Sequence, residues 1–338
     1  MMAVIDLNCD MGEGSAVDAQ LMPLMTSASI ACGGHAGDEQ TMRESIRLAL
    51  THGVSLGAHP SYPDREGFGR RAVRAAPDQV RADLAVQIQA LATLASEAGA
   101  ALRHVKPHGA LYNQAMSDRA LTEAIGAAVV DVDSSLIVVV LAGSPHARVL
   151  EDMGLRVARE AFIDRAYTAA GTLVSRDLPG AVITDAHYAA VRAVRMVRDG
   201  TTTAVDGTEL NLRPDTLCIH SDTPGAVAIA QAVRAALRDA DVSIVALPEV
   251  MSDPGPRTPV WPGPPDAFVP VSRHQLHRRK RRRRRARTSG RPAGPVPARA
   301  AATAVTDVTA AGRWRISLRH DPGKTVLGHR DRAGAAMD

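Results

Sequence analysis

A regular alternation of short apolar segments and longer amphipathic ones over the first 250 residues is the feature that most constrains this chain. Seven of the segments are typical of β-strands, because they are short and are either apolar throughout or alternate between polar and apolar residues. They cover residues 3–10, 28–35, 54–60, 102–109, 135–143, 156–164 and 215–222. Strands separated by helices predict a parallel sheet with right-handed crossover connections.

Amphipathic helices are expected between most of these strands. In residues 38–53, Met42, Ile46 and Leu50 recur at helical spacing, and Gly53 is placed to end the helix. Comparable patterns predict helices over residues 77–99, 183–200 and 224–241. Seven strands and their helices in about 250 residues fit a closed or nearly closed (β/α) barrel.

Polar side chains inside the expected strands decide between this barrel and a doubly wound open sheet. Alternate residues of a strand share one face. The alternating sets are Asp6, Asn8 and Asp10; Ser55, Gly57 and His59; His104, Lys106 and His108; and Cys218, His220 and Asp222. A sheet covered by helices on both faces has no room for so many polar groups, whereas a small barrel points them inward and towards its C-terminal mouth. The sequence therefore predicts an α/β fold with a seven-stranded barrel.

Charge and composition change sharply near residue 252. Residues 1–252 contain 21 Lys and Arg against 30 Asp and Glu, a net charge of −9, whereas the remainder has 19 against 6, or +13. A Pro-rich stretch over 252–268 is followed by the basic run HRRKRRRRRAR at 277–287. We therefore expect a barrel domain over 1–252 and a largely disordered basic tail over 253–338. The tail either binds nucleic acid or another acidic surface, or is a solvated or spurious extension.

Two broad classes of protein are disfavoured. No apolar run reaches the roughly 20 residues of a membrane-spanning helix, and the N-terminus lacks the pattern of a signal peptide, so we expect a cytoplasmic protein. Cys9, Cys32 and Cys218 lie in apolar stretches without CxxC or CxxH spacing, which argues against a disulfide scaffold or structural zinc site. Small buried side chains are the simplest interpretation of all three.

Candidate site residues cluster at the C-terminal ends of the expected strands. Lys106 is the only lysine in the first 279 residues of a chain that otherwise uses arginine. A lysine ammonium is compact, and its pKa shifts readily on burial, which favours a functional role over a solvated surface position. Asp10 is a candidate base or metal ligand, although a loop cap is the alternative. The other candidates are Glu13, His35, His59, Arg70, His108 and Glu160; for Arg70, a solvated loop position is equally consistent.

Six segments together resemble the LamB/YcsF family over about residues 4–248. They are DLNCDMGEG, IACGGHAGD, GAHPSYPDREGFGRR, VKPHGALYN, EAFIDRAY and CIHSDTPGA, in this order. The resemblance implies a seven-stranded (β/α) barrel of the glycoside hydrolase/deacetylase type. It also implies ATP-dependent opening of 5-oxoproline (pyroglutamate) to L-glutamate, carried out with two further subunits, B and C. The tail after residue 252 has no counterpart in this resemblance.

The implied chemistry gives the candidate residues provisional roles. Asp10, assisted by His59 or His108, is the predicted general base, while Lys106 and Arg70 bind carboxylate or phosphate charge. Glu13, His35 and Glu160 complete the pocket. ATP is expected to be bound through the complex, because HDPGKT at 320–325 lacks the first glycine of a phosphate-binding loop. The alternative is a metal-dependent deacetylase or amidase with a divalent ion on Asp10, His35, His59 and His108.

The sequence also gives an expectation for one substitution. If Lys106 acts only in the chemistry, Lys106→Met removes activity and leaves thermal stability nearly intact. A large loss of stability would instead indicate a structural role.

Overall fold

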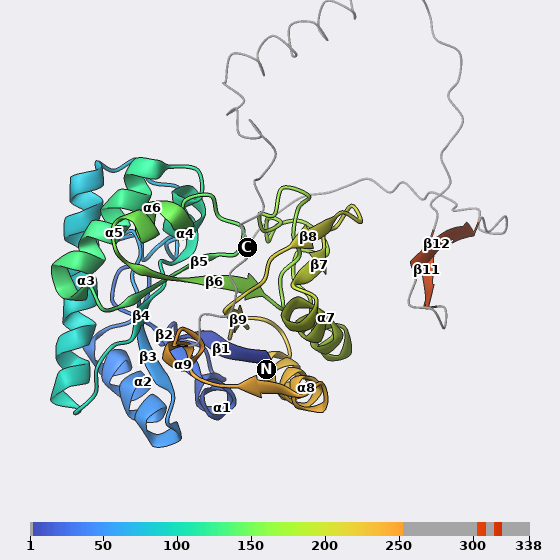
Figure 1. The fold of residues 1–338 in the computed structure, drawn as a ribbon, viewed down its shortest axis with the longest axis horizontal. Coiled ribbons are helices and arrows are strands. Elements are labelled where there is room, and N and C mark those ends of the chain that lie inside the picture. Colours follow the sequence, from blue (N-terminus) through green and yellow to red (C-terminus); the bar gives the residue numbers. More distant parts are fainter. Residues whose placement is uncertain (1–2, 253–302, 309–313, 320–338) are drawn as a thin grey trace, which may run out of the picture. The chain divides into compact units, whose positions relative to one another are not determined.

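Seven parallel strands form a closed barrel within residues 3–252 (Figure 1). The computed structural model describes residues 3–252, 303–308 and 314–319. The barrel strands are β1 (Ala3–Met11), β2 (Ser27–Ala31), β3 (Ser55–His59), β4 (His104–Val105), β5 (Ile137–Leu141), β6 (Arg156–Phe162) and β9 (Thr216–Cys218). Each strand pairs with the next, and β9 pairs back with β1, with Asn8 opposite Cys218. The barrel and its seven predicted strands are confirmed, and the doubly wound alternative is excluded by this closure. β4 and β9 are shorter than predicted, so Lys106, His108 and His220 lie beyond the ends of these strands.

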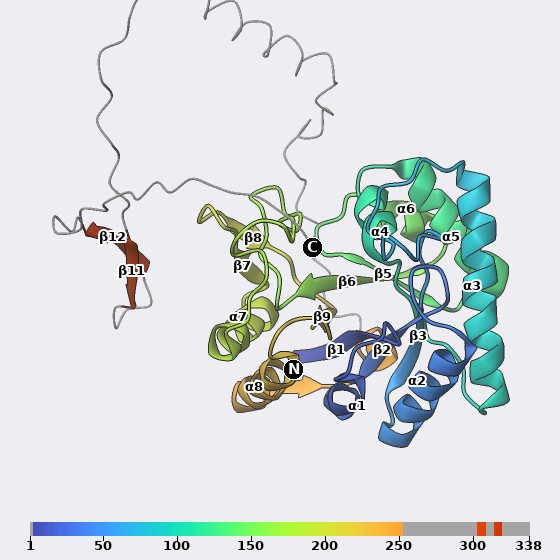
Figure 2. The same ribbon diagram turned by 180° about the vertical axis from the view of Figure 1, so that it is seen from behind.

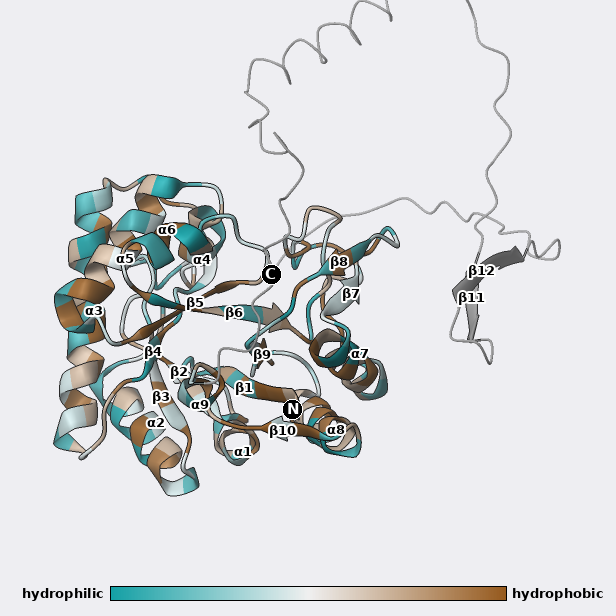
Figure 3. Ribbon diagram, in the orientation of Figure 1, coloured by the Kyte–Doolittle hydropathy of each residue, from teal (hydrophilic) through white to brown (hydrophobic). Residues whose placement is uncertain are grey.

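Helices cover the outside of the barrel. The longer ones are α2 (Glu39–His52), α3 (Pro77–Glu97), α4 (Gly109–Ala115), α5 (Arg119–Asp133), α6 (Ala147–Asp152), α7 (Ala186–Arg198) and α8 (Ala226–Asp239). Seen from behind, α2 and α3 flank one side and α7 and α8 the other (Figure 2). These helices carry both hydrophobic and hydrophilic residues (Figure 3), as expected for elements with one face on the barrel and one in water. The four helices predicted from periodicity are confirmed.

Shorter elements complete the residues around the barrel. They are α1 (Asp18–Leu21), the 3-10 helix η1 (Met22–Leu24), α9 (Leu247–Val250), the antiparallel pair β7 (Thr201–Thr203) and β8 (Glu209–Asn211), and β10 (Val242–Ile244), which pairs with the start of β1. At the N-terminal ends of the strands, the Leu247 backbone N–H donates to Ser27 Oγ at 3.3 Å. Leu247 also packs with Ile137, Val139 and Ala158 in a small apolar cluster.

The ends of α2 show how local sequence signals set the helix boundaries. Asp38 caps the N-terminus: its carboxylate accepts from the Thr41 backbone N–H at 2.8 Å, and Thr41 Oγ1 accepts from the Asp38 backbone N–H at 2.7 Å. Gly53 ends the helix in the left-handed conformation, with φ at 67°. Both ends therefore lie where the sequence predicts them.

Alternation along the strands separates an apolar outer layer from a polar interior. On β1, Leu7 and Cys9 belong to the main hydrophobic core, whereas the intervening Asp6, Asn8 and Asp10 are buried polar residues. Buried polar groups are stable only when their hydrogen bonds are made inside the protein. The interior of this barrel therefore has to be a connected polar network, and that network leads to the site described below.

Asp6 gives a pH-dependent prediction about stability. Its carboxylate accepts from the hydroxyls of Thr26, Ser27 and Thr216 at 2.5–2.8 Å. Burial nevertheless raises the pKa of Asp6 from 3.8 to about 6, and the nearby charge of Glu160 acts in the same direction. Between these two pH values the unfolded chain loses its proton before the folded one, so folding stability falls as the pH rises.

As the pH rises from 3.8 to 7, we expect the free energy of unfolding of Asp6→Asn to increase by about 3 kcal/mol relative to that of the natural chain. The reason is that the amide does not titrate, whereas Asp6 does. Urea unfolding of both proteins at pH 4 and pH 7 measures this difference. A difference in unfolding free energy that is the same at both pH values would contradict the assignment to Asp6.

A separate pair of described strands lies in the C-terminal part of the chain. β11 (Thr303–Val308) pairs antiparallel with β12 (Trp314–Arg319), a pairing that the sequence analysis does not identify. The basic run at 277–287 and the HDPGKT segment lie outside the described residues, and the domain boundary after residue 252 stays a prediction. Among the residues that the structure describes, no helix combines the length and apolar character needed to span a bilayer.

Candidate active site

The predicted site residues converge at the C-terminal mouth of the barrel, where the connecting loops of such folds build active sites. A cavity of about 1100 Å³ opens there. Its lining includes six of the eight predicted residues: Asp10, Glu13, His59, Arg70, Lys106 and His108. The other two lie directly behind the lining, His35 against Glu13 and Glu160 against Lys106. All except Arg70 are buried or nearly so.

Lys106 is the centre of the buried polar network. It directly follows the short strand β4, and its side chain is 3% exposed. Its Nζ lies 2.8 Å from Asp10 Oδ1, 2.8 Å from Glu160 Oε1 and 3.2 Å from Asn8 Oδ1, with Cys218 Sγ at 3.3 Å. The three protons of one ammonium are thus fully used by protein acceptors.

Glu160, on β6, is held from several strands at once. Asn8 Nδ2 donates to its Oε1 at 3.0 Å, and the Tyr112 hydroxyl donates to its Oε2 at 2.8 Å. Asn8 Nδ2 also donates to Thr216 Oγ1 at 2.7 Å. Because every partner is itself bonded, the network fixes the position of the Lys106 ammonium under the cavity.

The charges in this network stabilise one another. Burial alone would lower the pKa of Lys106, but the carboxylate of Asp10 and the neighbouring Cys218 and Glu160 raise it well above its usual value. Burial alone would raise the pKa of Asp10, but His59 and Lys106 together hold it well below its usual range. Lys106 is therefore a permanent cation and Asp10 a permanent anion near neutral pH.

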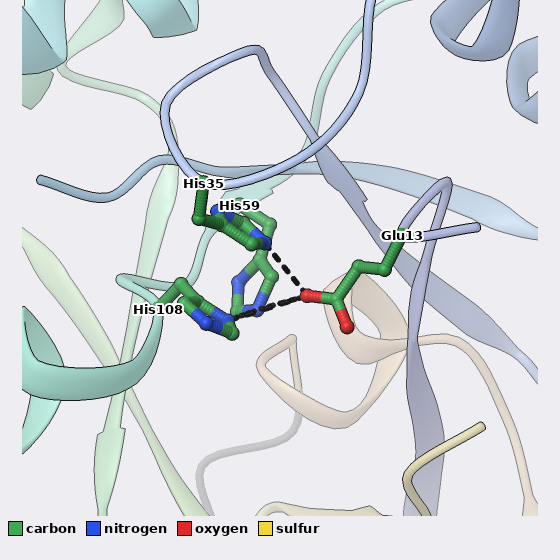
Figure 4. A group of neighbouring side chains, drawn as sticks. All are labelled: Glu13, His35, His59 and His108. Atoms are coloured by element: carbon green, nitrogen blue, oxygen red, sulfur yellow. Dashed lines mark hydrogen bonds and ion pairs between the residues drawn. The ribbon is translucent and has the colours of Figure 1, made fainter. Parts of the chain in front are cut away.

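Three imidazole rings surround one carboxylate oxygen beside this network (Figure 4). Glu13 Oε1 lies 2.7 Å from His35 Nε2, 3.3 Å from His108 Nδ1 and 3.6 Å from His59 Nε2. The rings of His35 and His108 stack with centroids 3.6 Å apart. His59 Nε2 also lies 3.4 Å from Asp10 Oδ2, which links the histidine cluster to the lysine network.

Burial and charge affect the four members of this cluster differently. The pKa of His35 is lowered to about 4, chiefly by burial, and that of His108 is lowered for the same reason. Burial also acts to lower the pKa of His59, but the charges of Asp10 and Glu13 outweigh it and raise the value. Burial would raise the pKa of Glu13, but its close contacts with His108 and His35 lower it, so its carboxylate is ionised.

The cluster also fits a divalent metal. Glu13, His35, His59 and His108 each offer one ligand atom, and these atoms lie within 4.8 Å of one another. In the metal-dependent alternative drawn from the sequence, Asp10 is the carboxylate ligand, whereas the structure groups Glu13 with the three histidines. A second group, Asp10, Cys218 and His220, meets the same distance limit. Imidazole and carboxylate are common ligands of first-row divalent ions.

Arginines lie at the mouth of the cavity. Arg70 Nη2 and Arg176 Nη1 bind the same Asp222 carboxylate, at 2.9 Å and 3.0 Å, and both line the cavity. Arg165 is a third cationic residue in the lining, and burial followed by repulsion from Arg176 lowers its pKa to about 10. Three guanidinium groups lie here and two of them share one carboxylate, which makes this part of the cavity suited to an anion.

One further acid–base pair, Asp164 with His220, is absent from the residues predicted for the site. The carboxylate of Asp164, just after β6, accepts from His220 Nδ1 at 2.9 Å and from Thr223 Oγ1 at 2.6 Å. Burial opposes ionisation here, but His220 and these hydrogen bonds lower the pKa of Asp164 to about 2. His220 lines the cavity. The polar alternation already placed His220 on the site face, but its pairing with Asp164 depends on the contact between β6 and β9.

Comparison with known proteins gives a consistent match for the barrel. The model of the LamB/YcsF family matches residues 5–252. A relative from Syntrophobacter fumaroxidans, named as the A subunit of 5-oxoprolinase, is 49% identical over 247 residues, which cover 72% of this chain and 98% of that protein. A relative of the same name from Symbiobacterium thermophilum is 50% identical over 245 residues, covering 71% and 94%.

A solved structure gives the same result. The crystal structure described as a lactam utilization protein from Thermus thermophilus is 46% identical and superposes with a TM-score of 0.67. The matched residues make up 72% of this chain and 99% of that protein. The similarity therefore extends over nearly the full length of the known protein and, in this chain, over the barrel.

Proposed function

The chain belongs to the LamB/YcsF family, and from this premise we propose that it acts as the A subunit of 5-oxoprolinase, a hydrolase that opens the cyclic amide of 5-oxoproline to give L-glutamate. The observation that carries the proposal is the match to proteins of that name at about half identity over nearly their whole length. The convergence of acids, bases and cations in one cavity gives it a chemical basis.

ATP dependence and partner subunits complete the proposal. Amide resonance deactivates a lactam carbonyl, and a five-membered ring closes readily, so net hydrolysis needs a strong driver. Phosphorylation of the amide oxygen would create a good leaving group. We assign the handling of ATP to subunits B and C, because this chain lacks a complete phosphate-binding loop. A reaction coupled to ATP in this way belongs in the cytoplasm.

The geometry suggests roles for the residues around the cavity. Asp10, with His59 or His108, is placed to accept a proton from an attacking water, since all three line the cavity and Asp10 Oδ2 lies 3.4 Å from His59 Nε2. Arg70 at the mouth suits the substrate carboxylate or a phosphate. Lys106, whose protons are already used by protein acceptors, is better suited to hold Asp10 and Glu160 in place than to bind substrate.

The remaining predicted residues support this arrangement. Glu13 and His35 orient His59 and His108 through the shared carboxylate oxygen, and Glu160 anchors Lys106. In this proposal Lys106 also contributes a fixed positive charge beneath the position where negative charge develops on the carbonyl oxygen.

A metal-dependent amidase or deacetylase is the second candidate function. The observation that favours it is the grouping of three histidines and Glu13 around one point. Such an enzyme would hydrolyse its amide without ATP and without partner subunits, so the two candidates make opposite predictions in one assay.

The test mixes the full chain with subunits B and C of a bacterial 5-oxoprolinase, ATP and 5-oxoproline, and follows the release of glutamate while each component is omitted in turn. We expect glutamate only in the complete mixture, and an Asp10→Asn chain to lower its rate by at least about 100-fold, in line with the loss of a general base. Glu66→Gln, on an exposed loop residue, is the matched control and should keep the rate.

Two outcomes would contradict the proposal. If folded chain and active partners release no glutamate, the lactam-opening role is wrong. If the chain alone hydrolyses an N-acetyl or simple amide substrate without ATP, the amidase candidate replaces it.

A further inference from the structure

The hydrogen bonds behind the histidine cluster fix which ring nitrogens carry protons. His59 Nδ1 lies 2.6 Å from the backbone carbonyl of Lys106, and His108 Nε2 lies 2.9 Å from that of Phe68. A carbonyl oxygen only accepts, so each of these nitrogens must donate an N–H. In the neutral rings, the opposite nitrogens, His59 Nε2 and His108 Nδ1, therefore present lone pairs.

These two lone pairs face each other. His59 Nε2 and His108 Nδ1 are 3.0 Å apart, and the ionised oxygen of Glu13 lies within 3.6 Å of both. Three acceptors that converge in a buried space repel one another unless either a proton on His59 or a metal ion supplies positive charge between them. From this convergence we propose that Glu13 Oε1, His35 Nε2, His59 Nε2 and His108 Nδ1 form a binding site for one divalent transition-metal ion.

The spacing of the four atoms agrees with a tetrahedral site. Ligand bonds of about 2.0–2.1 Å place tetrahedral ligands about 3.3 Å apart. The distances from Glu13 Oε1 are 2.7, 3.3 and 3.6 Å, and the distance between His59 Nε2 and His108 Nδ1 is 3.0 Å. The two remaining distances, from His35 Nε2 to the ring nitrogens of His59 and His108, are at most 4.8 Å, so the set lies close to tetrahedral spacing and closes on an ion by moving His35 inward. A set of three imidazoles and one carboxylate favours Zn²⁺ or a similar borderline ion over Mg²⁺ or Ca²⁺.

The surroundings have the features of a built ligand site. Metal-binding histidines typically donate their second N–H to a carbonyl or carboxylate, which fixes the tautomer. His59 and His108 both do so. Phe68, whose carbonyl serves His108, has a φ of 53°, a conformation that costs a non-glycine residue energy. His35 is 2% exposed, and its Nδ1 has no hydrogen-bond partner among the described residues, so internal hydrogen bonding leaves this ring incompletely satisfied.

Asp10 lies beside this set rather than in it. Its Oδ1 is bound by the Lys106 ammonium at 2.8 Å, while its Oδ2 lies 3.4 Å from His59 Nε2. An ion on the four ligands would supply a Lewis acid next to Asp10 at the wall of the cavity. Binding of the ion does not depend on which amide the cavity accepts.

The experiment uses Co²⁺, which absorbs visible light strongly in a four-coordinate site. The full chain is freed of metal with a chelator, dialysed and titrated with Co²⁺, and metal content is measured independently by mass spectrometry. We expect one equivalent per chain, with Zn²⁺ displacing it. Glu13→Gln and His35→Ala should weaken binding by more than about 100-fold, beyond the loss typical of an outer contact.

His187→Ala is the matched control, because His187 is exposed on α7 and distant in sequence from the four ligands. It should bind Co²⁺ as the natural chain does, and circular dichroism establishes that each variant is folded. Failure of the folded natural chain to take up one equivalent would overturn the proposal. Co²⁺ uptake that is the same in Glu13→Gln and His35→Ala as in the natural chain would also overturn it. Neither readout involves lactam opening, so a failure here is distinguishable from a failure of the proposed function.

Discussion

Replacing Lys106 by Met is expected to abolish lactam opening and to lower the free energy of unfolding by about 3–5 kcal/mol. The ammonium of Lys106 is the shared counter-ion of Asp10 and Glu160, and all three groups are buried. Methionine is similar in length but leaves the two carboxylates without their cation in a low-dielectric interior. Urea unfolding monitored by circular dichroism measures the stability, and glutamate release in the complete mixture measures the activity.

The matched control removes part of the excess negative charge. Glu160→Gln combined with Lys106→Met should be more stable than Lys106→Met alone, because one unpaired buried carboxylate is then neutral. The sequence by itself predicts that Lys106→Met leaves stability nearly intact, and the buried contacts lead us to expect the opposite. An unchanged unfolding midpoint, with activity lost, would limit Lys106 to a role in the chemistry.

Gly57→Ala is expected to destabilise the barrel by about 3 kcal/mol, at the upper end of the usual cost of overpacking. Gly57 on β3 pairs in register with His104 on β4, and a Cβ at Gly57 would lie 2.1 Å from His104 Nε2. The His104 ring is 1% exposed, and its Nε2 contacts Ser29 Oγ at 3.2 Å, so it has little room to move aside. Urea unfolding of the folded variant measures the loss.

A second substitution tests the cause. If the clash with the imidazole is responsible, Gly57→Ala should cost much less in a His104→Ala background, where the ring is absent. Equal costs in both backgrounds would show that the destabilisation arises from the backbone of β3 and not from this contact.

The fold was largely predictable because its signals are local. Alternation within a strand follows from the pleat, so Asp6, Asn8 and Asp10 had to share a face. The capping box of Asp38 with Thr41 lies within four residues and depends on nothing else in the chain. Barrel closure was predictable only indirectly, because the strands carry more polar side chains than a sheet covered by helices on both faces can accommodate.

The residues proposed for the site could be chosen from the sequence, and the structure brings them together, but their contacts could not be predicted. Lys106 and Asp10 are separated by 96 positions, and Lys106 follows β4 whereas Glu160 lies on β6. The pairing of Asp164 with His220 likewise depends on β6 lying beside β9. Such contacts follow from strand order and register, which no short segment of sequence contains.

The sequence by itself determined that a set of acids, histidines and one lysine gathers at the barrel mouth, since each lies at the C-terminal end of a strand or in the loop that follows. Only the tertiary structure decided that Lys106 is enclosed by protein acceptors and that Glu13, not Asp10, is grouped with the three histidines. The physical reason is that hydrogen bonding and ion pairing change over tenths of an ångström, whereas strand patterns fix only the face and the end of the barrel on which a side chain lies.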